Sequence, residues 1–308
     1  MLKRMLAVTM IGAGGAFAQD VTPAVQPSNE PALTPISSEP VVNAEDPDAR
    51  KKRTEALLDD IEKADRAIKT LTAKVVYEKR FDLGGDTQTR WGRMIYTDDK
   101  MPDAERKRRF AVHFDRLRVG SRLEEERRSY LFDGVWFIEK RHNDSEISKW
   151  RMVREGEKID PLRIGEGRMP IAIGQRKEDI LARFMVESPD AEDGLATPEG
   201  EDDAPFALLR THAAGTVQIK LVPIAGTEES RDLREVRLWY RKIEGATDGV
   251  TYLPVLAREV NRSLDVSTVR LGDVVANGEF DAADLDTTDP EGWKIDIRDL
   301  KGNALSAE

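Results

Sequence analysis

The chain has 308 residues, of which 34% are charged and 39% hydrophobic, and its formal net charge is −10. This size suits one large or two small globular domains with a real core, and the acidic balance disfavours a general nucleic-acid-binding protein. Cysteine is absent, which excludes a disulfide framework and a lipid anchor on an N-terminal cysteine.

The first 18 residues have the features of a secretory signal peptide. Lys3 and Arg4 precede an uncharged stretch that ends in the small-residue pattern Ala-Phe-Ala, so we expect cleavage between Ala18 and Gln19 and export to the periplasm. A signal anchor is the alternative, but fourteen residues with three glycines are short and weakly apolar for a membrane span. We therefore expect no membrane span in the mature chain, whose charge would be −12 because the signal peptide holds two cations and no acid.

The next segment, residues 19–45, is rich in Pro, Ser, Ala and Glu and predicts a disordered linker. A folded domain is expected over 46–300, followed by a short tail over 301–308. Asp46-Pro47 suits the start of a helix, and apolar residues then recur at spacings of three and four up to Leu71. This pattern predicts a long amphipathic helix over 47–71 whose apolar stripe packs on the rest of the domain.

Beyond the helix the hydrophobic period changes from three or four to two, which is typical of strands. The gaps between the strands are too short for helical crossovers, so the pattern predicts an antiparallel meander of about eleven strands. The expected strands are 73–81, 88–97, 108–118, 124–132, 135–142, 146–154, 216–223, 233–242, 253–262, 267–277 and 292–297.

An insert interrupts the strands between Ile159 and Glu187. Its first half is apolar but full of Gly and Pro, and its second half, RKEDILARFMVE, predicts a short amphipathic helix. Residues 188–205, rich in Pro, Gly, Asp and Glu, are expected to form a loop.

The sequence gives no support for a catalytic or metal site. No G-x-S-x-G turn occurs, and His113, His142 and His212 are far apart without metal-ligand spacing. Gly165-Glu166-Gly167 begins like a dinucleotide fingerprint, but Pro170 stands in place of the third glycine. We therefore expect a protein that is not an enzyme and has no cofactor; a Ser–His pair or converging carboxylates in a pocket would change this expectation.

Basic residues concentrate in one part of the strand region: Arg106, Lys107, Arg108, Arg109, Arg116, Arg118, Arg127 and Arg128. Such a stretch could contact lipid headgroups or an acidic partner. It could equally serve only to keep exposed strands soluble.

Four stretches, in order along the chain, resemble the periplasmic outer-membrane lipoprotein carrier family, the LolA-like proteins, and mark this chain as a divergent relative. They are LLDDIEKADRAIKTLTAKVVYEKR, ERRSYLFDGVWFIEKR, VQIKLVPIAG with LREVRLWYRK, and STVRLGDVVANGEFDAADLDTTDPEGWKIDI. The last contains Asn277 and the pattern Pro290-x-Gly292. Together the four stretches extend from about Leu57 to Ile297.

The resemblance implies an α+β, mainly antiparallel fold: an unclosed half-barrel around an apolar cavity, with the N-terminal helix and a helical insert as its lid. It implies a monomeric, non-enzymatic carrier that takes up the acyl chains of lipoproteins or other lipid cargo. An inner-membrane releasing complex and an outer-membrane acceptor are then the expected partners. The family's lid arginine has no assigned counterpart, because the longer segment TDDKMPDAERKRRFAVHF replaces the family motif; Arg93 and Arg109 lie nearby.

Strand alternation and this resemblance nominate the apolar residues that would line the cavity. The strand candidates are Val75, Tyr77, Met94, Tyr96, Val112, Phe114, Trp136, Ile138, Val217, Ile219, Val236, Leu238 and Tyr240. The lid candidates are Leu162, Ile164, Met169, Ile171 and Ile173. For each residue taken singly, ordinary core packing is an equally good interpretation.

The stretch SYLFDGVWFIEKR is apolar on both sides of one turn. A two-residue loop at Asp133-Gly134 would set Phe132 opposite Val135 and Leu131 opposite Trp136. Both faces of the sheet would then be apolar near the turn, so the face outside the cavity would need its own cover or a partner.

A second function remains open beside the carrier. The same half-barrel could serve an exported interaction or sensor module that binds a lipoprotein or an envelope protein. A large, dry, apolar concavity under the insert would favour the carrier, and a filled sandwich core would count against it.

Overall fold

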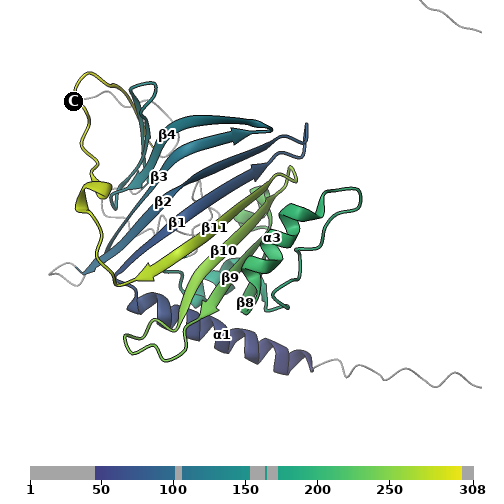
Figure 1. Ribbon diagram of the computed structural model, residues 1–308. Coiled ribbons are helices and arrows are strands. Elements are labelled where there is room, and N and C mark those ends of the chain that lie inside the picture. Colours follow the sequence, from purple (N-terminus) through teal and green to yellow (C-terminus); the bar gives the residue numbers. More distant parts are fainter. Residues whose placement is uncertain (1–45, 101–105, 153–163, 165–172, 300–308) are drawn as a thin grey trace, which may run out of the picture. The chain divides into compact units, whose positions relative to one another are not determined.

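The computed structural model describes residues 46–100, 106–152, 164 and 173–299, and all structural statements below concern these residues. Their strands form one sheet in the order β12-β6-β5-β4-β3-β2-β1-β11-β10-β9-β8-β7 (Figure 1). The order is linear and begins and ends with different strands, so the sheet does not close into a barrel. The predicted open, mainly antiparallel sheet is confirmed.

The sheet has twelve strands. They are β1 (Thr70–Arg80), β2 (Thr87–Lys100), β3 (Arg106–Val119), β4 (Arg122–Phe132), β5 (Trp136–Arg141), β6 (Glu146–Arg151), β7 (Phe184–Glu187), β8 (Thr216–Pro223), β9 (Leu233–Lys242), β10 (Tyr252–Asn261), β11 (Val266–Ala276) and β12 (Lys294–Arg298).

Two antiparallel meanders make up this sheet, one from β1 to β6 and the other from β7 to β11. They join where β1 pairs with β11, from Leu71 opposite Ala276 to Arg80 opposite Val266. The chain finally returns to the far edge, where β12 pairs with β6 in parallel. This parallel pair is the exception in the otherwise antiparallel sheet.

The first helix, α1 (Pro47–Ala67), begins as the sequence predicts. Asp46 is its N-cap and accepts a hydrogen bond from the amide of Asp48. The helix ends four residues earlier than predicted, because Asn277 Oδ1 accepts from the amide of Lys69 while Asn277 Nδ2 donates to the carbonyl of Ala67. Leu71 therefore belongs to β1 and packs in the same apolar cluster as the helix.

Two elements differ from the prediction for the middle of the chain. The expected helix over RKEDILARFMVE is helical only at α2 (Lys177–Arg183). Its last four residues form a strand, β7, that was not among the eleven predicted strands. A helix that the sequence analysis missed, α3 (Asp203–Ala213), begins at the end of the expected loop, with Asp202 as its N-cap.

The remaining short elements are α4 (Glu229–Asp232) and the 3-10 helix η1 (Ala282–Leu285). We call the side of the sheet that packs against α1 the inner face and the opposite side the outer face. On the outer face, α3 and the acidic loop before it cover Trp239 and Leu256. That loop is held by Arg237, which donates to the carboxylate and the carbonyl of Asp193.

Candidate functional site

The inner face carries one continuous apolar cluster. Because side chains alternate along a strand, every second side chain points to this face. Buried residues of the cluster come from strands on both sides of the β1–β11 junction. α1 adds Leu58, Ile61 and Ala64, and the segment before and within α2 adds Ile173 and Ile180. The cover of this face is therefore made of helical and irregular segments and not of a second sheet.

Eleven of the thirteen predicted strand residues lie in or against this cluster. They are Val75, Tyr77, Met94, Tyr96, Val112, Phe114, Val217, Ile219, Val236, Leu238 and Tyr240. Of the lid candidates, Ile164 and Ile173 belong to the same cluster, whereas Leu162, Met169 and Ile171 lie outside the described residues.

Trp136 and Ile138 do not lie on the inner face, contrary to the prediction. Both pack in a separate cluster on the outer face with Ala111, Leu131 and Ile147. The reason is the alternation of β5: Phe137, between them, points to the inner cluster. The prediction chose the wrong parity for this strand.

A group of aromatic rings that the sequence analysis did not nominate lies near the β4–β5 hairpin. The ring of Phe137 is 6.3 Å from that of Phe110, 5.9 Å from that of Tyr130 and 6.0 Å from that of Trp150, centroid to centroid. Phe132 lies 5.9 Å from Phe110 in the same measure. The alternation of SYLF on β4 was the signal that could have found Phe132.

The hairpin itself has a different register from the predicted one. Phe132 pairs with Phe137, and Asp133 pairs with Trp136 through a backbone hydrogen bond, so the loop residues are Gly134 and Val135. Asp133 Oδ1 accepts from the amides of Val135 and Trp136, both at 2.8 Å, which accounts for the shift.

Both faces of this hairpin are nonetheless apolar, as the sequence predicts. On the outer face Leu131 and Ile138 are covered by Leu285 and Trp293 of the segment that leads to β12. The chain thus supplies its own cover there, and no partner is needed to bury these side chains.

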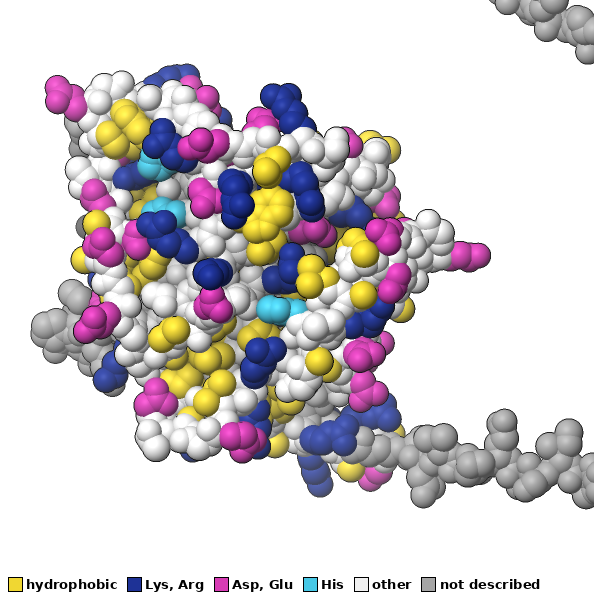
Figure 2. Space-filling view, in the orientation of Figure 1, with side chains coloured by type: hydrophobic (Ala, Val, Ile, Leu, Met, Phe, Trp, Pro, Cys, Tyr) yellow, Lys and Arg dark blue, Asp and Glu magenta, His cyan; other side chains and the backbone are white. Residues whose placement is uncertain are grey.

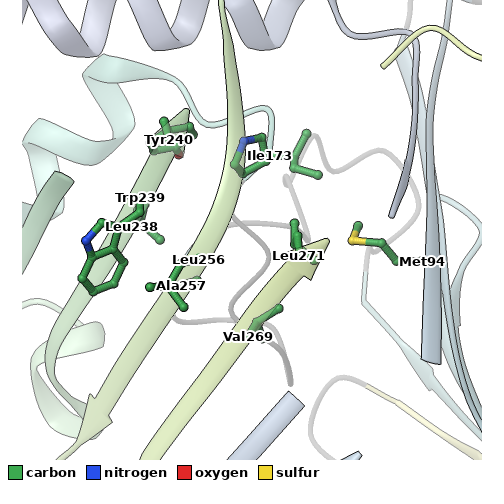
Figure 3. A pocket seen from close by; sticks show the side chains of 10 residues that line it. Met94, Ile173, Leu238, Trp239, Tyr240, Leu256, Ala257, Val269 and Leu271 are labelled. Carbon is green, nitrogen blue, oxygen red and sulfur yellow. The ribbon is translucent and has the colours of Figure 1, made fainter. Parts of the chain in front are cut away.

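A small apolar cavity lies at the centre of the inner face (Figure 3). Its wall includes Met94 of β2, Leu238 of β9, Leu271 of β11 and Ile173 of the cover. The cavity volume is about 20 Å³, close to the room that a single water needs. This cavity is far smaller than the large open concavity expected for a carrier, because α1 and Ile173 pack against the inner face.

Two polar contacts join segments of the cover to one another and to α4. The first is Asp65 of α1, whose Oδ2 accepts from the amide of Gly174 at 2.9 Å, next to Arg108 of β3. The second is Arg183 of α2, which donates from Nη1 to Glu229 at 2.7 Å and to the carbonyl of Ile164 at 3.0 Å.

Arg108 thus lies beside the cover, whereas Arg93 and Arg109, the arginines near the region of the unassigned lid arginine, do not. Arg93 pairs with Asp284 on the outer face, and Arg109 pairs with Asp99. Sequence spacing alone could not choose among neighbouring arginines of one strand region.

The inner face also has a charged end. Arg90 pairs with Glu126 at 2.9 Å, and Arg128 pairs with Glu126 at 2.8 Å and with Glu139 at 3.1 Å. The opposite charges contact one another directly, so this network gives the inner face a polar rim without calling for a bound ion.

The basic stretch of the sequence is divided between the two faces of the sheet. Arg108 and Arg128 point to the inner face, whereas Arg116 and Arg118 lie over the ring of Trp91, at 5.7 and 5.3 Å from its centroid. Figure 2, which views the outer face, shows basic and acidic side chains interspersed there. The described part of this stretch therefore does not form a single basic binding surface.

Two of the three histidines meet at Ser129, although the sequence places them far apart. His113 Nδ1 lies 2.8 Å and His142 Nε2 3.0 Å from Ser129 Oγ, and His113 Nε2 lies 2.8 Å from the carbonyl of Asp284. A carbonyl can only accept, so Nε2 of His113 donates and Nδ1 is left to accept from the serine hydroxyl.

Such a pair has the geometry of a nucleophile and its base, but access decides against catalysis. Ser129 is 5% exposed and lies under the segment that carries Asp284. Burial lowers the pKa of His113 and of His142, which keeps both rings neutral. The group is best explained as the polar attachment of the C-terminal segment to the outer face.

Among the described residues, no group of three or more His, Cys, Asp or Glu side chains could hold a metal ion. The search of those same residues for a helix able to cross a membrane also found none.

No family model matches the chain, and no curated protein matches it. Solved structures similar to it include an uncharacterised conserved protein from Thermus thermophilus, with 12% identity over 80% of this chain and 99% of that one and a TM-score of 0.39. A putative outer membrane lipoprotein-sorting protein domain from Vibrio parahaemolyticus is 8% identical over 74% and 95%, with a TM-score of 0.36. A LolA superfamily protein from Nitrosomonas europaea is 10% identical over 74% and 94%, with a TM-score of 0.31.

Proposed function

We propose that the protein is a non-enzymatic, exported carrier that binds acyl chains between the inner face of its sheet and the cover formed by α1 and residues 173–183. The observation that supports this function is the apolar inner face, which continues across both meanders and is closed by segments other than a sheet. The resemblance of four sequence stretches to lipoprotein carriers supports a lipoprotein as the cargo.

The energetics require the cover to move. A cavity of about 20 Å³ cannot hold an acyl chain. A sixteen-carbon chain gains about 12 kcal/mol on transfer from water, at about 0.8 kcal/mol per methylene. Cargo that replaces the cover against the inner face can therefore offset the cost of exposing the apolar stripe of α1.

The polar rim fits the shape of such a cargo. An acylated protein joins apolar chains to a polar peptide, and the inner face places Arg90, Arg128 and Glu139 at one end of a largely apolar surface. We propose that the acyl chains lie along the apolar part and that the polar part of the cargo lies toward this rim.

The test is binding of a fluorescent acyl probe and of a synthetic triacylated lipopeptide to residues 19–308. We expect saturable binding of both, with the lipopeptide competing for the probe. Leu238→Gln, on the inner face, should weaken binding by about tenfold or more, because it leaves an amide in an apolar site. Leu123→Gln is the matched control, since Leu123 is 61% exposed. Equal affinities of the two variants, or no saturable binding by the unaltered protein, would refute the proposal.

A further inference from the structure

Asp65 is a carboxylate in the apolar stripe of α1. Its neighbours in that stripe are Leu58, Ile61 and Ile68, and Asp65 itself is 3% exposed. It is part of the cover, and it points at the segment that begins with Ile173, which lines the central cavity. An acidic side chain at such a position is costly unless it is hydrogen-bonded, paired or protonated.

The contacts around Asp65 join three separate parts of the chain. Its carboxylate accepts from the backbone amides of Gly174 and Gln175, before α2. Gly174 has φ +77°, and a Cβ there would lie 2.8 Å from Cζ of Arg108. Arg108 in turn lies 3.7 Å, Nε to Oδ2, from Asp98 of β2. Only glycine fits between Asp65 and Arg108 without displacing one of them.

The charges that face Asp65 come from each of the packed elements. They are Arg108 on β3, Glu62 on α1 itself and the phenol of Tyr240 on β9, with Asp98 of β2 beyond the guanidinium. Arg108 thus faces two buried carboxyl groups, those of Asp65 and Asp98. When Asp65 is protonated, the guanidinium of Arg108 still faces the carboxylate of Asp98.

We propose that Asp65 is a proton-linked clasp: it takes up a proton when α1 and residues 173–176 close over the inner face and releases it when they separate. The mechanism is independent of any cargo, and its effect on acyl binding rests on the proposed function.

The direction of the pH dependence follows from the two environments of the carboxyl. Burial raises the pKa of Asp65 from 3.8 to about 7 in the closed state, against the opposing effects of the Gly174 hydrogen bond and Arg108. In an open state in water the pKa returns toward 3.8. Closing is therefore most favoured below pH 3.8. Above that pH, the ratio of closed to open protein falls about tenfold per pH unit until about pH 7. Acid closes the cover, and neutral or alkaline pH releases it.

The absence of cysteine allows a direct measurement of the cover. Spin labels on Leu181→Cys of α2 and Leu123→Cys of β4, both exposed positions, report the distance between cover and sheet in the mature protein. We expect a short distance at pH 5 and a growing population of longer distances up to pH 8. A distance distribution that is the same at both pH values overturns the proposal.

Three variants test whether Asp65 causes the change of distance with pH. Asp65→Asn imitates the protonated side chain and should keep the short distance at pH 5 and pH 8. Gly174→Ala should keep the short distance at pH 5 but give more of the long distance at pH 8 than the unaltered protein, because its methyl group displaces the guanidinium of Arg108 that offsets the charge of ionised Asp65. Glu259→Gln is the control: burial also raises the pKa of Glu259, so it should respond to pH as the unaltered protein does. A full pH response of Asp65→Asn would contradict the proposal.

A second measurement uses the unaltered protein and therefore does not depend on the folding of a variant. In protein labelled with 13C at the aspartate carboxyls, the Asp65 resonance, assigned through its own backbone, should titrate near pH 7. Titration near 3.8 would overturn the proposal. These readouts use no ligand, so the two proposals can fail separately. A pH-dependent movement of the cover without acyl binding would refute the carrier function alone. Acyl binding without a pH-dependent movement would refute the clasp alone.

Discussion

At Gly92, in the middle of β2, a side chain has no room. A Cβ there would lie 1.9 Å from the carbonyl oxygen of His113 and 2.9 Å from Cα of Phe114. These are backbone atoms of β3 next to the irregularity in the β2–β3 register, so they can move only by shifting the strand.

We predict that Gly92→Ala lowers the free energy of unfolding by about 3 kcal/mol, because the added methyl group clashes with the backbone of β3 and strains both strands. Urea denaturation followed by circular dichroism measures the change. Gly272→Ala on β11 is the matched control: its nearest neighbour would be Lys74 Cβ at 4.0 Å, and we expect a change within about 0.5 kcal/mol. Equal losses in the two variants would show that close approach at Gly92 is not the cause.

The individual residues of the inner face were predictable to the extent that strand alternation is local. Val217 and Ile219 of β8, separated by Gln218, and Val236 and Leu238 of β9, separated by Arg237, alternate with polar residues and lie in or against the inner cluster. Trp136 was assigned to the wrong face, because every residue from Val135 to Ile138 is apolar and alternation gives no signal in such a run. The partner of Asp65 could not be predicted, since Arg108 and Gly174 are distant from it in sequence.

At the scale of elements, α2 is tied to α4 through a buried ion pair. The side chains of Arg183 and Glu229 are 7% and 6% exposed and lie 2.7 Å apart, Nη1 to Oε1. Removal of one partner leaves the other charge buried without its counter-ion.

We predict that Arg183→Met destabilises the protein by about 3–5 kcal/mol, whereas Arg183→Met with Glu229→Leu costs clearly less, because no lone charge remains. Thermal or urea unfolding of the two single variants and the double variant measures the coupling. Arg176→Met is the control, because the Arg176–Asp179 pair is largely solvent-exposed and should cost at most about 0.5 kcal/mol. Additive losses in the double variant would contradict the prediction.

The segment that leads to β12 is attached to the outer face through His113. Burial, helped by the nearby charges of Arg93 and Lys140, lowers the pKa of this ring below its ordinary value of 6.5. The stabilisation by neutral His113 is therefore complete above pH 6.5 and decreases as the pH falls below that value, until the lowered pKa is reached.

We predict that acidification from pH 7 to pH 5 speeds hydrogen exchange of the backbone around η1, beyond the change in intrinsic exchange rate. His113→Gln should exchange faster already at pH 7 and should lose most of this acid sensitivity. His212 is also buried and its pKa is also lowered, but it bonds to the carbonyl of Val255, so His212→Gln should leave exchange around η1 unchanged. If His113→Gln keeps the full acid response, another group is responsible.

Elements that local sequence patterns specify were predicted well, and elements that depend on contacts far away in the sequence were not. Strands β8 and β9 were predicted at their observed bounds, because each is an alternating run between turn residues. The end of α1 and the strand β7 were not, since both depend on partners far away: Asn277 accepts from Lys69, and β7 pairs with β8. α3 was missed because its residues follow an acidic loop and its apolar face is only partly buried, with Phe206 and Ala213 as its buried residues.

For the molecule as a whole, the proposed acyl binding is a two-step event, because the cover packs against the inner face. With a cavity of about 20 Å³, the acyl probe can enter only after α1 and residues 173–183 have moved. We predict that the observed rate of probe binding levels off as the probe concentration rises, at the rate of opening. Stopped-flow fluorescence measures this rate. A rate that rises linearly over the whole range would show a pocket that is already open.

The junction of β1 and β11 has a consequence for how the chain reaches its native state. β1 lies in the interior of the sheet, yet its partner begins at Val266, after more than half of the chain has followed. During synthesis the first meander can pair early through local hairpins, but one edge of β1 stays without its native neighbour until residues 266–276 arrive. Such non-local pairing slows folding, and an unpaired edge with apolar side chains invites association with other chains. The strand at the centre of the finished sheet is thus the one most in need of protection while the protein is incomplete.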